Sequence, residues 1–63
     1  MSPETIRRYR SELRLTRAEL AREMGVAERT IIRWELGQFK PHPIFLEKLR
    51  YLKRRAREKV VAQ

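Results

Sequence analysis

The sequence predicts an all-α fold, a compact bundle of four to five helices, from three observations. Apolar residues recur three or four positions apart along most of the chain, which is the period of an amphipathic helix. Residues that begin helices, such as Ser2 before Pro3, alternate with glycines that end them. At 63 residues without cysteine, we expect the chain to form one domain that is stabilised by a compact helical core, with dimerisation as a second possible source of stability.

The first two helices are marked by their caps. Ser2 precedes a helix that ends near Arg14, and its core face carries an apolar stripe. This stripe consists of Ile6, Tyr9 and Leu13. Thr16 and Glu19 form a capping box for a second helix, which closes at Gly25, where a left-handed backbone costs least.

The positions of Gly37 and Pro43 predict the bounds of two more helices. The third runs from about Ala27 or Glu28 to Leu36 and ends at Gly37. Pro43 starts the fourth, which we expect to reach about Val61 because no residue that breaks helices follows. Its apolar stripe comprises Phe45, Leu49, Leu52, Ala56 and Val60.

The segment 17–36 carries the most informative pattern of the chain. Ala21 and Gly25 are small residues that let two helices cross closely, and five apolar positions would bury the inner faces of both helices. These positions are Leu20, Met24, Val26, Ile31 and Trp34. Two short helices with this arrangement predict a helix-turn-helix whose second helix presents its outer face to a DNA major groove.

The charge balance indicates a polyanionic partner. Lys and Arg number 16 against 8 acidic residues, a net charge of +8, which favours DNA first, RNA second and an acidic membrane third. No apolar run suggests a secretion signal or a membrane span, so we expect a cytoplasmic, nucleoid-associated protein. With no cysteine, one histidine and no glycine-rich phosphate loop, we expect no enzyme, no catalytic residues, no cofactor and no metal.

The run LTRAELAREMGVAERTIIRWELGQFKP, with Glu35, Gly37 and Pro41 as E-x-G-x-x-x-P, resembles the Cro/repressor-like helix-turn-helix family, the XRE type. The resemblance extends from about Ile6 to Leu52. It implies a lambda-repressor-like DNA-binding domain that binds operator DNA as a homodimer and represses transcription. It also implies a structural ion pair between Arg10 and Glu35.

The chain departs from the family pattern at three positions. Arg17 replaces the glutamine that commonly opens the second helix, where it reaches phosphate and supports the recognition helix. Ala27 replaces the usual serine or threonine cap of the third helix, at a cost of roughly 1 kcal/mol. Arg14 stands where glycine is common, so the turn between the first two helices can differ.

The outer side of the third helix, here called the recognition face, is formed by Glu28, Arg29, Ile32 and Arg33. Arg33 can donate two hydrogen bonds to guanine, and Arg29 can do the same or bind a phosphate. Ile32 can pack on a thymine methyl group. Glu28 is open to two interpretations, acceptance from a cytosine amino group or a favourable acid at a helix N-terminus.

Phosphate contacts are expected on both sides of the recognition face, from Thr16, Arg17, Gln38, Lys40 and His42. Arg17 begins a helix, where backbone N–H groups also attract phosphate, whereas Thr16 is first of all a cap. Trp34 could stack on a base, but its inward spacing predicts a core residue. The role of Phe39 is left open: its side chain can anchor the loop or contact a partner.

Residues from about 53 to 62 form a basic helical extension of the single domain 1–63. This extension can be a solvated surface, an arm that contacts phosphates, or the polar flank of a dimer interface. We expect the last, with a dimer seam formed at least in part by Leu52, Ala56 and Val60.

The sequence therefore predicts a sequence-specific transcriptional regulator that binds double-stranded DNA at a palindromic operator. The expected type is a repressor of a phage, a mobile element or a toxin–antitoxin system, and its homodimer can be one that forms only on DNA. Two alternatives remain: a basic RNA-binding or ribosome-associated module, and an antitoxin-like protein that binds a partner such as a toxin.

Overall fold

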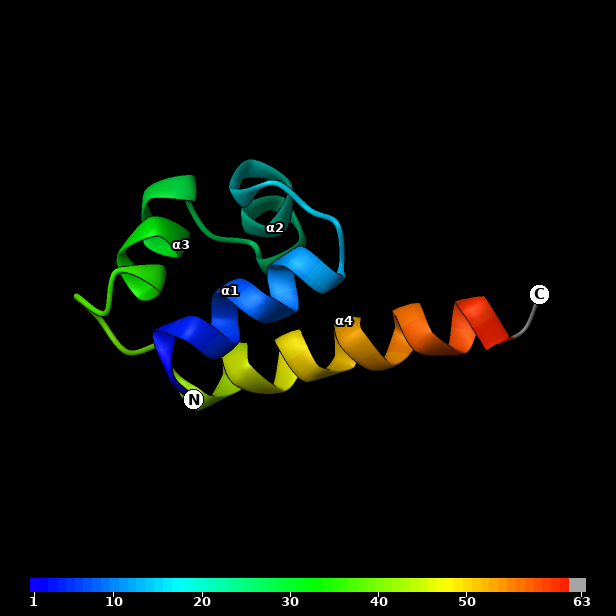
Figure 1. Cartoon of the computed structure of the whole chain (residues 1–63). Coiled ribbons are helices and arrows are strands. Elements are labelled where there is room, and N and C mark those ends of the chain that lie inside the picture. The colour runs from blue at the N-terminus through cyan, green and yellow to red at the C-terminus, as the bar shows by residue number, and fades with distance from the viewer. Residues whose placement is uncertain (62–63) are drawn as a thin grey trace.

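The computed structural model describes the backbone of residues 1–61 and the side chains of residues 1–58 (Figure 1). This part of the chain contains no strand and four helices, α1 (Pro3–Glu12), α2 (Arg17–Met24), α3 (Glu28–Glu35) and α4 (Pro43–Val61). The predicted all-α class is confirmed, with the lower of the two expected helix numbers in the described residues. None of these helices combines the length and the apolar character that a membrane span requires.

The first three helices form a cluster beside the N-terminal half of α4. Helix α3 packs against both α1 and α2, and α2 also contacts α4. Figure 1 shows that α4 runs along α1 and then continues past the other helices at its C-terminal end. The molecule is therefore elongated, with principal extents of 38 × 20 × 18 Å.

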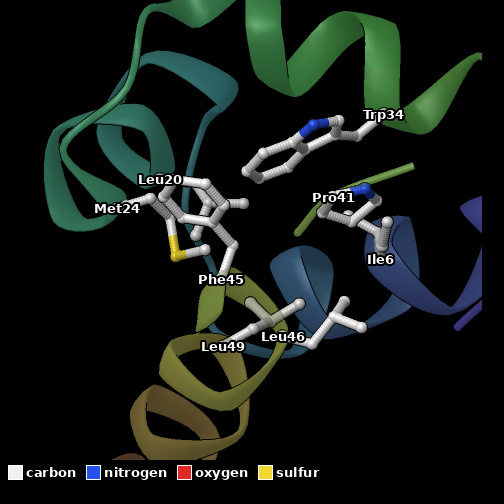
Figure 2. Close-up of a pocket in the computed structure, with 8 residues that line it drawn as sticks. All are labelled: Ile6, Leu20, Met24, Trp34, Pro41, Phe45, Leu46 and Leu49. Carbon is white, nitrogen blue, oxygen red and sulfur yellow. The ribbon is translucent and has the colours of Figure 1, made fainter. Parts of the chain in front are cut away.

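The core lies where the inner faces of the four helices meet. Its buried members are Ile6, Leu20, Ala21, Met24, Ile31, Trp34 and Leu49. Trp34 of α3 faces Phe45 of α4, with ring centroids 5.3 Å apart and the planes tilted by 46°, which is a favourable aromatic arrangement (Figure 2). The side chains drawn in Figure 2 leave no room between them for a water molecule. Trp34 is a core residue, as its spacing predicted.

The helix starts follow the predicted caps. The Ser2 hydroxyl accepts a hydrogen bond from the Thr5 N–H, and Thr16 and Glu19 form the expected reciprocal capping box. Ala27 precedes α3 without any side-chain cap. The first N–H groups of α3 therefore lack the acceptor that a serine or threonine would supply.

The turn from α1 to α2 has the geometry that glycine normally gives, although Arg14 occupies it. Arg14 has a φ of 58°, in the left-handed region. The Leu15 N–H donates to the Arg10 carbonyl at 3.2 Å, and the Val26 N–H donates to the Ala21 carbonyl at 3.0 Å in the matching position after α2. Arg14 thus adopts the left-handed conformation that Gly25 adopts after α2, and it bears the conformational cost that a glycine would avoid.

The side chain of Lys53 joins α4 to α1. Its ammonium group pairs with Glu12 and lies 5.0 Å from the ring centroid of Tyr9. This contact fixes the middle of α4 against the C-terminal end of α1, before α4 extends beyond the bundle.

Candidate nucleic-acid interface

Helix α3 has one buried and one exposed side. Ile31, Trp34 and Glu35 face the interior and are at most 5% exposed. The recognition face lies on the other side: Glu28, Arg29 and Arg33 are exposed and Ile32 is half-buried. The structure therefore brings the four residues predicted to contact bases together on one surface of one helix.

Glu35 is the one charged residue in the described part of the chain whose side chain is fully buried, with 1% of it exposed. Two arginines bind its carboxylate. Arg10 donates from Nε to Oε2 at 2.6 Å and from Nη2 to Oε1 at 3.3 Å. Arg17 donates from Nε to Oε1 at 3.0 Å. We call these three residues the Glu35 cluster.

Two further hydrogen bonds attach α1 to the elements around this cluster. Arg10 Nη1 donates to the carbonyl of Leu15 at 3.2 Å, and Arg7 Nη1 donates to the backbone carbonyl of Glu35 at 3.2 Å. The end of α3 is thus joined to α1 by side-chain and backbone contacts and to the start of α2 by Arg17. Helix α3 is held on two sides by hydrogen bonds from charged side chains, which are stronger than neutral ones.

Burial raises the pKa of Glu35, but the hydrogen bonds and charges of Arg10 and Arg17 lower it by more, so that the pKa lies below its ordinary value. The carboxylate is therefore ionised at neutral pH. Two guanidinium groups share one carboxylate, which leaves the Glu35 cluster with a net positive charge.

Sequence reasoning missed the pairing of Arg17 with Glu35. The side chain of Arg17 remains 46% exposed, and its bond to Glu35 uses only Nε. The Nη groups, at the N-terminus of α2, can still donate to an anion. A signal existed, because Arg17 occupies the position that supports the recognition helix in the family the sequence resembles.

The other residues predicted to contact phosphates lie at the surface around α3. Thr16 accepts a hydrogen bond from the Glu19 N–H at 3.1 Å, so its cap role occupies part of the hydroxyl. Gln38 and Lys40 are exposed in the loop after α3. His42 is exposed too, and its Nδ1 accepts from the Ile44 N–H at 3.2 Å, which makes it a cap of α4. Nε2 of the neutral ring then carries the proton and can donate outward.

Phe39 lies in the same loop and is 58% exposed. The guanidinium carbon of Arg33 is 5.6 Å from the centroid of its ring. An aromatic ring therefore lies beside the last residue of the recognition face.

The residues of the proposed dimer seam have different surroundings. Leu52 is half-buried and packs against the core of its own chain. Ala56 is half-buried as well, and with Leu52 it lines an open groove of about 330 Å³ whose other walls are Leu13, Leu15, Glu23 and Arg55. The side chain of Val60 lies outside the described residues.

The comparisons with known proteins agree with this geometry. The family model described as Helix-turn-helix matches residues 6–50. A curated protein of Methanothermobacter thermautotrophicus, described as an uncharacterized HTH-type transcriptional regulator, is 43% identical over 44 residues. The match covers 70% of this chain and 64% of that relative, so the chain spans less than two thirds of its length. No solved structure gives a significant match. The family match covers the recognition face, the Glu35 cluster and every buried member of the core, and the chain belongs to the XRE-type helix-turn-helix family.

Proposed function

We propose that the protein is a DNA-binding transcriptional regulator that reads the major groove with α3. One observation carries the proposal: the exposed side of α3 bears the recognition face, and its buried end is fixed by the Glu35 cluster. A helix that is held rigidly and exposes arginines is suited to entering a groove N-terminus first. The family match and the description of the archaeal relative support the same function.

On this proposal each residue of the recognition face has a chemical role. Arg33 donates two parallel hydrogen bonds to guanine O6 and N7, and Ile32 packs on a thymine methyl group. Arg29 contacts a second base or a phosphate. Glu28 accepts from a cytosine amino group or acts as a helix N-terminal acid.

Phosphate contacts would fix the position of α3 on the duplex. Arg17 offers its free Nη groups at the start of α2, and Thr16 lies beside it. Gln38, Lys40 and His42 would bind the backbone on the other side of the groove. The net charge of +8 strengthens all of these contacts at low salt.

We further propose that the protein represses transcription as a homodimer on a palindromic operator, as a regulator of a phage, a mobile element or a toxin–antitoxin system. One recognition helix contacts only a few base pairs, and a second copy doubles the surface that reads sequence. The groove beside Ala56 and the part of α4 that extends past the bundle offer an open face for a second copy (Figure 1). Because Leu52 already packs on its own core, it contributes only its remaining surface.

The dimer proposal is tested by sedimentation with and without a duplex that carries two half-sites about one helical turn apart. We expect a complex of two chains per duplex. A complex of one chain per duplex with protein in excess would contradict it.

Selection of bound sequences from random duplex DNA tests the main proposal. We expect a short motif to be enriched, and binding to the enriched duplex to resist competition by scrambled DNA. An RNA hairpin used as a competitor distinguishes DNA binding from the RNA-binding alternative. If the protein binds RNA, the hairpin should compete better than any DNA duplex. Failure to enrich any sequence would contradict the proposal.

A further inference from the structure

Phe39 and Arg33 form a contact that the base-reading and phosphate-binding roles leave unexplained. The guanidinium carbon of Arg33 lies 5.6 Å from the Phe39 ring centroid, within the range of a cation–π interaction. Phe39 is 58% exposed and Arg33 is exposed too, so core packing does not account for their proximity.

The backbone after α3 brings the two residues together. The Gly37 N–H donates to the Trp34 carbonyl at 3.2 Å, and the Gln38 N–H donates to the Arg33 carbonyl at 2.9 Å. With a left-handed φ of 77° at Gly37, these bonds form a Schellman motif, which reverses the chain at the end of the helix. The chain therefore returns toward Arg33 and presents Phe39 to it.

The loop that carries Phe39 is supported by the start of α1. A β-carbon placed on Gly37 would lie 3.4 Å from Cγ of Pro3, so the backbone at Gly37 lies against the Pro3 ring. Phe39 also borders a hollow of about 220 Å³ whose walls include Pro3 and Pro41. Proline fixes its own φ, which further restricts this short loop.

Arg33 differs in this respect from the arginines of the Glu35 cluster. Arg10 and Arg17 are held by a carboxylate that neutralises part of their charge. Among the described residues, no carboxylate pairs with Arg33, and the aromatic ring of Phe39 is the group beside its guanidinium. The ring can orient the guanidinium and leave its full charge for DNA.

We propose that Phe39 is a positioning residue for base recognition, which holds the Arg33 guanidinium ready to bind a guanine edge. The role rests on the proposed function. The contact with the ring needs no N–H donor of the guanidinium, whereas the bidentate contact to O6 and N7 uses its N–H groups. Both contacts can therefore exist together, and prior orientation reduces the side-chain entropy that is lost on binding.

The test uses the full chain and duplexes selected from random DNA. The base pair read by Arg33 is the position at which R33A loses its preference. We expect F39L, which keeps an apolar side chain without a ring, to lower discrimination at that base pair about two- to fivefold. F39Y keeps the ring and should retain the wild-type preference. I44A is the control, because Ile44 is similarly exposed, at 61%, and belongs to the first turn of α4.

A measurement without DNA accompanies the binding assay. In the free protein we expect an aromatic ring-current shift on the Arg33 side-chain NMR signals, which F39L removes and I44A leaves in place. Absence of this shift in the wild type would overturn the proposal.

The outcomes distinguish this role from the proposed function. Enrichment of a motif by the wild type, together with unchanged or greater discrimination in F39L, would overturn only the role of Phe39. Greater discrimination would show that the ring holds Arg33 away from the base. A wild-type protein that enriches no sequence would overturn the proposed function and this role with it.

Discussion

Removal of Arg10 should destabilise the fold by far more than loss of a surface ion pair. R10M deletes two hydrogen bonds to the Glu35 carboxylate, of 2.6 and 3.3 Å, and one to the Leu15 carbonyl. Breaking a buried pair costs about 3–5 kcal/mol when the remaining charge has no partner. Arg17 still binds the carboxylate here, so we expect about 2–3 kcal/mol, against a ceiling of ~1 kcal/mol for an exposed pair.

The complementary change, E35L, should cost less, about 1–2 kcal/mol, because it leaves no buried charge behind. Arg10 and Arg17 are 21% and 46% exposed and can turn toward water. The double variant R10M/E35L should then be more stable than the sum of the single losses predicts, by about 1–2 kcal/mol.

Urea unfolding followed by circular dichroism and by tryptophan fluorescence measures these values. Trp34 is the chain's single tryptophan and is buried against Phe45, so its emission reports the core. If a variant is unfolded without urea, R10K provides a milder change that keeps the charge and loses the forked geometry. Additivity of the two single losses within about 0.5 kcal/mol would refute the reasoning.

Acid should weaken the same cluster. The folded-state pKa of Glu35 is lowered, so its contribution is complete above the unfolded value of about 4.3 and is lost as the pH falls through the folded-state value. Glu19 acts in the same direction, because the Thr16 backbone N–H and hydroxyl lower its pKa. As the pH falls below about 4.3, E35L should therefore lose less stability than the wild type, and the loss that remains in E35L is the part due to Glu19.

Two further substitutions should stabilise the chain. Arg14 has a left-handed φ of 58°, so R14G should raise the free energy of unfolding by about 0.5–1 kcal/mol. This gain is the relief of backbone strain less the added conformational freedom of glycine in the unfolded chain. R14A should give no gain, and equal urea midpoints for R14G and R14A would contradict the prediction. A27S should add the missing cap of α3 and raise stability by about 1 kcal/mol, and an unchanged melting temperature would contradict it.

Local features of the fold could be predicted from the sequence because neighbouring residues determine them. The capping box of Thr16 and Glu19 and the inward position of Trp34 depend only on spacing along one helix. The sequence also predicted the apolar stripe of α4, but the spacing of its residues does not reveal whether the rest of the chain or a second subunit covers them. The structure places Leu52 against its own core, which depends on the path of α4 beside α1 and α2.

The contacts around the recognition face depend on tertiary geometry. Arg17 meets Glu35 only because the start of α2 lies beside the end of α3, and neither segment shows this alone. Phe39 meets Arg33 because Gly37 reverses the chain, and the sequence left its role open. Arg10 and Glu35 were expected to pair only through the family resemblance, and the structure places them in contact.

A comparison of R33A with K40A on the selected duplex and on a scrambled duplex tests the central claim most directly. The account predicts that R33A weakens only the selected duplex, by roughly 1–3 kcal/mol, and loses preference at one base pair. K40A should weaken both duplexes alike and reduce the salt dependence by about one unit. Equal weakening of both duplexes by R33A would make Arg33 a phosphate contact and contradict the assignment of α3 as the helix that reads sequence.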